Sequence, residues 1–247
     1  MIDIIRSEWT KLRSVRSTLW TLAATAAMMI GFGALLSFAV KENAEGPVDV
    51  QNALMTSLTG AMFASLSIAA LGVLVISGEY RTGGIRTSLL AVPRRLHLLA
   101  GKAVVFTVTS LVVCTLAAAG ALAAGLAITQ PTGVTTGDLV RSAVGAGLYL
   151  TACGLFGLAL GTLVRHTAGA LVTAIALILV LPTVVTQLPG KWGRTVAEYF
   201  TTNAGQLIMT DGGGPSSLSP WGGFAVYLAW IAVAAVAAGV LLHRRDA

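Results

Sequence analysis

Six long stretches of the chain contain no Asp, Glu, Lys or Arg, and they decide which solvent surrounds most of this protein. Each stretch reaches the roughly 20 residues that an α-helix needs to cross the hydrocarbon core of a bilayer. The stretches are continuously apolar rather than alternating, and a helix satisfies its own backbone in lipid, so helices are favoured over barrel strands. The predicted spans are 19–40, 53–78, 103–128, 142–164, 167–188 and 221–242.

The composition agrees with a membrane protein. Hydrophobic residues make up 55% of the 247 residues and charged residues 11%, whereas a soluble domain carries about 25% charged residues. The expected fold class is all-α: a polytopic membrane protein whose six-span domain, 19–247, follows a short N-terminal segment, 1–18. Cys114 and Cys153 fall inside apolar spans, where two small buried side chains are favoured over a disulfide.

The basic residues are distributed unequally between the two sides of the predicted membrane. If the N-terminus lies inside, the inner segments hold three times as many cations as the outer ones, as the positive-inside rule requires. The chain is therefore expected in the plasma (inner) membrane with cytoplasmic N- and C-termini, and its net charge of +6 needs no nucleic-acid partner. The inner cations are Arg6, Lys11, Arg13, Arg16, Arg81, Arg86, Arg94, Arg95, Lys102, Arg165, Arg244 and Arg245, and the outer ones are Lys41, Arg141, Lys191 and Arg194.

The N-terminal segment 1–18 is predicted to form an amphipathic helix at the inner interface. Arg6 and Arg13 project from the side opposite the apolar face, which suits a helix in the headgroup layer with membrane lipid as its partner. Glu8 interrupts the apolar face, and a basic tail that only sets topology is the alternative. The apolar face is lined by Ile2, Ile5, Trp9 and Leu12, which follow helical spacing.

The longest predicted outer connector, 189–220, is not uniformly polar. Apolar and aromatic side chains recur near helical spacing from Trp192 to Phe200, Asn203–Gly205 breaks that pattern, and the apolar patch Leu207–Met209 follows. The pattern predicts two short outer helices that lie on the membrane or re-enter it. An irregular ordered loop is the alternative.

Glycines on one face of the fourth predicted span indicate close helix packing. Small residues allow helix backbones to approach closely in lipid, so tight packing within the subunit is favoured, and a dimer interface is the alternative. Pro182, in the fifth span, is expected to kink that helix or to free a carbonyl group. The glycines are Gly147, Gly154, Gly157 and Gly161.

The sequence predicts no catalytic site and no metal site. The spans lack the carboxylates and cations that ion-coupled transporters use, and the three histidines fall at membrane edges. The pair Gly101–Lys102 lacks the preceding glycine of a phosphate-binding loop, and the aqueous segments are too short for a nucleotide-binding domain. The chain is therefore not expected to be an enzyme, and any energy must come from another polypeptide.

The connector between the second and third spans differs from the other connectors. It reads "GEYRTGGIRTSLLAVPRRLHLLAGK", residues 78–102. After a glycine pair, Ile85–Val92 can form two helical turns with Leu89 on the apolar face and Arg86 turned away, and Pro93 ends them. A cytoplasmic partner that binds a short helix of this kind could transmit force to both of the spans that the connector joins. A basic loop that only sets topology is the alternative.

This connector resembles the signature connector of the type-2 class of ABC transporter permeases. The likeness extends to the basic start "EWTKLRSVRSTLWTL" and to the patch "NAGQLIM" before the last span. It implies the permease subunit of an exporter, with a coupling helix at Ile85–Val92, which forms a homodimer or a heterodimer. It also implies two copies of a separate ABC ATPase that bind ATP and Mg, so that this chain holds no cofactor. The residues that it implies for the ATPase-coupling interface are Glu79, Arg81, Ile85, Arg86, Leu89, Pro93 and Arg94.

Two other functions remain open from the sequence. One is a non-transporting membrane anchor or sensor that recruits a cytoplasmic partner through the same connector. The other is an uncoupled or ion-coupled carrier. The spans carry no fixed charge to complement a ligand, which favours an apolar or amphipathic cargo without naming one.

Overall fold

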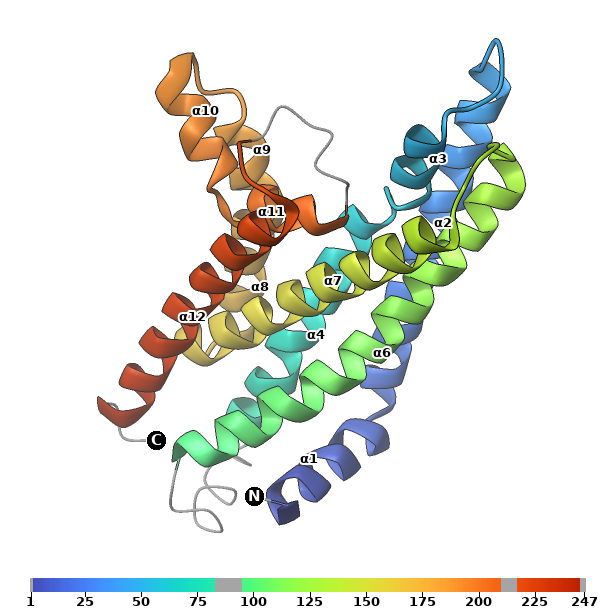
Figure 1. The fold of residues 1–247 in the computed structure, drawn as a ribbon. Helices are drawn as coiled ribbons and strands as arrows, with labels where there is room; N and C mark the ends of the chain where they lie inside the picture. The colour runs from blue at the N-terminus through green and yellow to red at the C-terminus, as the bar shows by residue number, and fades with distance from the viewer. Residues whose placement is uncertain (1, 83–94, 210–216, 245–247) are drawn as a thin grey trace.

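The computed structural model describes residues 2–82, 95–209 and 217–244, and over these residues the chain forms helices and no strands. The predicted all-α fold and its six membrane-spanning segments are confirmed (Figure 1). In chain order the spans are α2 (Arg16–Asn43), α3 with α4 (Val50–Ser57 and Ala61–Thr82), α6 (Arg95–Thr129), α7 (Thr136–Val164), α8 with η1 and α9 (Thr167–Ile175, Ala176–Val180 and Leu181–Val185), and α12 (Pro220–Arg244).

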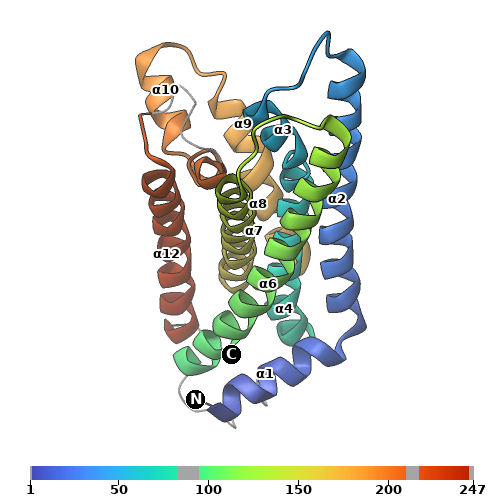
Figure 2. The same cartoon turned by 45° about the vertical axis from the view of Figure 1, so that its right-hand side comes forward.

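Within the described ranges, four shorter helices lie outside or between these spans: α1 (Ile2–Ser14), α10 (Gly190–Glu198), α11 (Thr201–Gly205) and the 3-10 helix η2 (Gln206–Met209). One end of the bundle, called here the N-terminal end, carries α1, the end of α4, the start of α6 and the end of α12 (Figures 1 and 2). The opposite end carries α3, α10 and the turn between α6 and α7.

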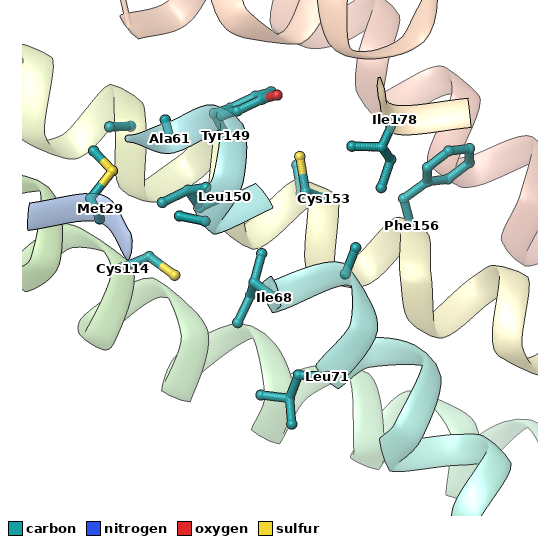
Figure 3. Close-up of a cluster of buried hydrophobic side chains, with 14 of the residues drawn as sticks. Met29, Ala61, Ile68, Leu71, Cys114, Tyr149, Leu150, Cys153, Phe156 and Ile178 are labelled. Atoms are coloured by element: carbon teal, nitrogen blue, oxygen red, sulfur yellow. The ribbon is translucent and has the colours of Figure 1, made fainter. Parts of the chain in front are cut away.

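Helix α7 is the centre of the bundle. Its apolar stretch is 83% buried inside the protein, against 22% for α2 and for the α8–α9 span. Helices α4 and α6 both pack along α7, while α2 packs on α4 and α6 further out. Figure 3 shows the resulting core, in which Ile68 and Leu71 of α4, Cys114 of α6 and Leu150 of α7 lie close together.

The backbones of α4 and α7 touch each other directly. A Cβ atom at Gly157 of α7 would collide with the carbonyl oxygen of Ala69, and one at Gly72 of α4 would collide with the carbonyl oxygen of Gly154. At Gly161 a Cβ atom would lie 2.6 Å from a methyl carbon of Ile76. Glycines allow this approach because they place no side chain between the two helices, and dispersion then holds the helices together in lipid.

Helix α7 is equally close to its other neighbours. A Cβ atom at Gly147 would collide with the hydroxyl of Thr115 on α6, and one at Gly145 would collide with the carbonyl oxygen of Ile208 on η2. A polar contact in this region also joins η2 to α7, because Gln206 of η2 donates to the hydroxyl of Tyr149 at 3.1 Å. The centre of the bundle is therefore held by backbone contacts together with a few polar side chains.

The second span is not the continuous helix that the sequence predicts. The turn Leu58–Gly60 separates α3 from α4. The structural reason lies in the neighbouring helices, because Gly60 lies against the backbone of Met29 on α2 and Gly125 of α6 lies against the side chain of Ser57. The chain passes between α2 and α6 at this point.

Pro182 frees a carbonyl group in the fifth span, and residues from the outer connector occupy it. Pro182 has no amide hydrogen for the carbonyl of Ile178, and the π-helical turn η1 precedes it. The hydroxyl of Thr202 donates to that carbonyl at 2.9 Å, and the hydroxyl of Thr201 donates to the carbonyl of Leu177 at 2.9 Å. The irregular turn is thus satisfied by α11 rather than by its own helix.

The outer connector forms α10, α11 and η2, but its break lies elsewhere than predicted. The two short helices are separated at Tyr199 and Phe200, whereas Asn203–Gly205 lies inside α11. The Asn203 amide donates to the carbonyl oxygens of Pro182, at 3.2 Å, and Ala197, at 3.1 Å. The first contact ties α11 to the fifth span and the second ties it to α10. The position of α11 therefore depends in part on a distant helix, which a local sequence pattern could not reveal.

We expect Gly157→Ala to destabilise the protein, because the added methyl group must push α4 away from α7. Overpacking of this kind costs about 1–3 kcal/mol. Gly31→Ala in α2 is the matched control, because a Cβ atom there meets nothing within 4 Å. The midpoint of thermal unfolding in one detergent, followed by circular dichroism, should fall for Gly157→Ala only. Equal midpoints for the two variants would contradict the backbone contact.

Candidate functional site at the N-terminal end

The connector predicted to couple to an ATPase is flanked by two helices of the core. Glu79 and Arg81 lie in the last turn of α4, which ends at Thr82, and the described chain resumes at Arg95 in α6. Ile85–Val92, with its expected coupling residues Ile85, Arg86 and Leu89, and also Pro93 and Arg94, lies outside the described residues. The described part of this site therefore consists of the ends of α4 and α6 and of what packs on them.

Helix α1 packs across the start of α6 at this end (Figure 2). The approach is close, because a Cβ atom at Gly101 of α6 would lie 2.6 Å from a methyl carbon of Ile4 on α1. A break at Val15, in extended backbone conformation, separates α1 from α2 and lets the chain change direction. Helix α1 thus lies against the helix that follows the connector.

A buried ion pair joins α1 to α6. The Lys102 ammonium lies 2.5 Å from one carboxylate oxygen of Glu8, and the Lys11 ammonium lies 2.7 Å from the other. The side chains of Glu8 and Lys102 are only 4% and 3% exposed, whereas that of Lys11 is 43% exposed. Charges that leave water are costly unless they are paired, so each member of the buried pair requires the other.

Glu8 is held in its ionised form by its lysine partners. Burial by itself raises the pKa of this carboxyl group, but the charge of Lys102 and the hydrogen bonds from Lys102 and Lys11 outweigh burial. The net effect lowers the pKa of Glu8 below its usual value of 4.5. Glu8 is therefore ionised at neutral pH.

A pocket of about 530 Å³ opens beside the ion pair. Residues from α1, α2, α4, α6 and the start of α8 line it. Its apolar walls include Leu71, Leu74 and Val75 of α4 and Leu12 of α1, and Glu8, Lys11 and Lys102 border it.

The chain from residue 4 to residue 188 matches the family model of the ABC-2 family transporter proteins. The chain belongs to the ABC-2 transporter family. The match begins in α1 and ends just after α9, so it covers both the buried ion pair and the connector. A comparison with curated proteins found no match.

Membership in this family identifies the chain as a permease subunit of an ABC transporter, and the six apolar spans identify it as a multi-pass membrane protein. The family implies a partner ABC ATPase. Within the described residues of the ABC-2 permease, no group of three His, Cys, Asp or Glu residues could hold a metal ion. His166, at the predicted membrane edge, accepts a hydrogen bond from the amide of Gly169 and caps the start of α8.

The Glu8–Lys102 pair is the feature of this permease that sequence reasoning missed. The sequence pattern placed Glu8 on the apolar face of the N-terminal helix as an interruption, and it placed Lys102 at the end of the connector. In the structure Lys102 lies inside α6, and Glu8 is the most buried described residue of α1, whereas Trp9 is 48% exposed. A carboxylate on an apolar helix face and a lysine at the start of an apolar span were the two signals that could have suggested the pair.

We expect Glu8→Gln or Lys102→Met alone to destabilise the docking of α1 by about 3–5 kcal/mol, because each removes one member of the buried Glu8–Lys102 pair and leaves the other buried. The double variant Glu8→Met/Lys102→Met should be destabilised by less than the sum of the two single variants, since it removes both buried charges. Lys11→Gln is the control, and its effect should be small because water already screens this exposed lysine. Hydrogen exchange of the α1 amides measures the docking directly. If the destabilisation of α1 in the double variant equalled the sum of the two single-variant effects, the result would contradict the pairing of Glu8 with Lys102.

The same measurement should show a defined pH dependence. The pKa of Glu8 is lowered in the folded protein, so the stabilisation is complete above its unfolded value of 4.5 and is lost as the pH falls through the lower folded value. Protection of α1 should therefore be constant from neutral pH down to about pH 5. Loss of protection between pH 7 and about pH 5 would contradict an ionised, paired Glu8.

Proposed function

We propose that this ABC-2 permease subunit exports its substrate, driven by ATP hydrolysis in partner ABC ATPase subunits that bind at the N-terminal end. ATP and Mg are bound by the ATPase, and the permease chain contributes no nucleotide site. The observation that carries the proposal is the packing of α4 and α6, the two helices that flank the connector. Both lie directly against α7, the centre of the bundle.

The mechanism follows from this packing. A force applied to the connector reaches the ends of α4 and α6 together. The glycine contacts leave no compressible layer of side chains between α4 and α7, so a displacement of α4 moves α7 as well. ATP-driven closure of the ATPase subunits would then shift the core against the outer helices and alternate access to the two sides.

Helix α1 takes part in the same movement. Its Glu8 forms a buried ion pair with Lys102, which lies seven residues after the start of α6. Separating Glu8 from Lys102 would break this buried pair at a large cost in free energy, so α1 follows α6 when the connector moves. An interfacial helix that moves with the core would transmit the displacement to the surrounding headgroup layer.

The orientation of the subunit is supported by its charge distribution. Arg6, Arg13 and Arg16 lie in α1 and at the start of α2, and Arg165 lies in the turn between α7 and α8. These residues belong to the N-terminal end, which we therefore assign to the cytoplasm, together with both chain termini. This orientation places the connector on the side where ATP is available.

The assembly that we propose contains two permease subunits and two ATPase subunits. The permease pair is a homodimer or a heterodimer, as the resemblance to type-2 permeases implies. The coupling helix at Ile85–Val92, with Glu79 and Arg81 at its membrane-proximal side, would form the contact with the ATPase. The alternative, a non-transporting anchor, would bind a cytoplasmic partner without changing the rate at which that partner hydrolyses ATP.

We expect Leu89→Asp to abolish coupling, because a charge on the apolar face of the coupling helix would be buried without a partner against the ATPase. Co-purification with an ABC ATPase encoded beside the permease, and stimulation of its ATP hydrolysis, should both fall about tenfold or more. Val134→Asp is the matched control, because it introduces the same charge into the turn between α6 and α7, at the opposite end of the bundle.

The control variant should co-purify and stimulate as the unaltered subunit does. Equal behaviour of Leu89→Asp and Val134→Asp would show that the ATPase does not bind through the connector. Binding of the ATPase without any change in its activity would support the anchor instead of the exporter.

A further inference from the structure

The pocket beside α1 has the size and the walls of a site for an alkyl chain. Its volume of about 530 Å³ lies within the range of roughly 300–1,000 Å³ in which small molecules are bound. Leu71, Leu74 and Val75 line it from α4, and Leu12 lines it from α1. Covering this apolar surface with an apolar molecule instead of water is favourable, so the walls suit a hydrocarbon.

A buried hydroxyl group in the wall of the pocket has no partner. Ser77 of α4 is 2% exposed, and in the part of the chain that the structure describes its Oγ atom makes no hydrogen bond. A serine in an apolar helix can donate to the carbonyl one turn earlier, as Ser110 of α6 does to Phe106 at 2.7 Å. Leaving a buried hydroxyl without a partner costs free energy, so Ser77 points to a ligand with a polar atom.

Three more uncharged hydroxyl groups belong to residues that line the pocket. They are those of Ser17 and Thr18 on α2 and of Thr167 at the start of α8. A hydroxyl group can both donate and accept hydrogen bonds. These residues therefore suit a small neutral polar head on a molecule that is otherwise apolar.

The ionised groups at the border of the pocket are paired with each other. The carboxylate of Glu8 lies within ion-pair distance of the ammonium groups of both Lys11 and Lys102. An anionic head would compete with Glu8 for the lysines, and a cationic head would compete with the lysines for Glu8. A neutral head leaves the buried pair intact, so the pocket favours an uncharged ligand.

We propose that this pocket binds an uncharged amphiphile, an alkyl chain that ends in a hydroxyl group. The chain would lie along Leu71, Leu74 and Val75, and its hydroxyl oxygen would accept a hydrogen bond from Ser77. Long-chain alcohols and acylglycerols have this chemistry. Binding at this pocket uses residues of one subunit only and does not depend on the proposed export.

The binding test uses the full-length permease with its ATPase in lipid nanodiscs. The probe is 1-decanol with a photoreactive diazirine in its chain, and peptide mass spectrometry identifies the labelled residues after illumination. We expect labels on the part of α4 that holds Leu71, Leu74 and Val75, and unlabelled 1-decanol should compete for them. Decane has the same chain without the hydroxyl, and decyl sulfate has the same chain with a permanent charge. Each should compete at least about tenfold less well at equal concentration in the lipid, because neither satisfies Ser77 without disturbing the ion pairs.

Variants of the pocket locate the bound molecule. Ser77→Ala should weaken labelling by about tenfold. Ser110→Ala is the matched control, because it removes a buried hydroxyl that already donates within α6. Leu74→Trp should fill the apolar part of the pocket and abolish labelling. Val108→Trp adds the same ring at an exposed position on α6 and should leave labelling unchanged.

Four results would overturn the proposal. Competition by decane as strong as that by 1-decanol would show that the hydroxyl group is not recognised. Competition by decyl sulfate that is equal or stronger would make the site one for an anion. Equal labelling of Ser77→Ala and Ser110→Ala would remove Ser77 from the site, and labelling that survives Leu74→Trp would reduce binding to general partition into the bilayer. The thermal unfolding midpoint of each variant separates loss of binding from loss of fold, and Ser77→Ala should keep its midpoint because it removes a hydroxyl that has no partner.

Discussion

The direct backbone contact between α4 and α7 is the constraint on which the rest of the structure depends. Lipid tails are as apolar as the side chains of the spans, so burial alone gives the helices little reason to associate. Gly72 and Gly157 remove the side chains that would keep the two helices apart, and Phe106 and Ile68 fill the space around Gly154. The peripheral helices α2, α8 and α12 then pack on a core that is already defined.

The Glu8–Lys102 pair extends this core to a helix that does not span the membrane. The pair is buried at the N-terminal end of the bundle, where the connector leaves α4 and enters α6. A buried pair contributes less to net stability than to the choice of one arrangement, because its partners cannot separate without a large cost. Helix α1 is thereby bound to α6 in a single position.

The sequence predicted those features that depend on local composition, and it missed those that depend on distant partners. The six spans follow from uncharged stretches, and the freed carbonyl follows from Pro182 alone. The pairing of Glu8 with Lys102 joins residues 94 positions apart, and the division of the second span at Gly60 depends on α2 and α6. The position of α11 depends on hydroxyl groups that meet carbonyls of the fifth span, so no periodicity within 189–220 could reveal it. The coupling helix stays a prediction.

If partner ATPase subunits drive this permease as we propose, α1, α4, α6 and α7 should move as one body when those subunits close. The most direct test is the distance between spin labels on Arg13→Cys in α1 and Val108→Cys in α6, compared with that between Val108→Cys and Val236→Cys in α12. We predict that trapping the ATPase with ATP leaves the first distance distribution unchanged and shifts the second. A change in the distance between α1 and α6, with α6 and α12 fixed relative to each other, would contradict the account.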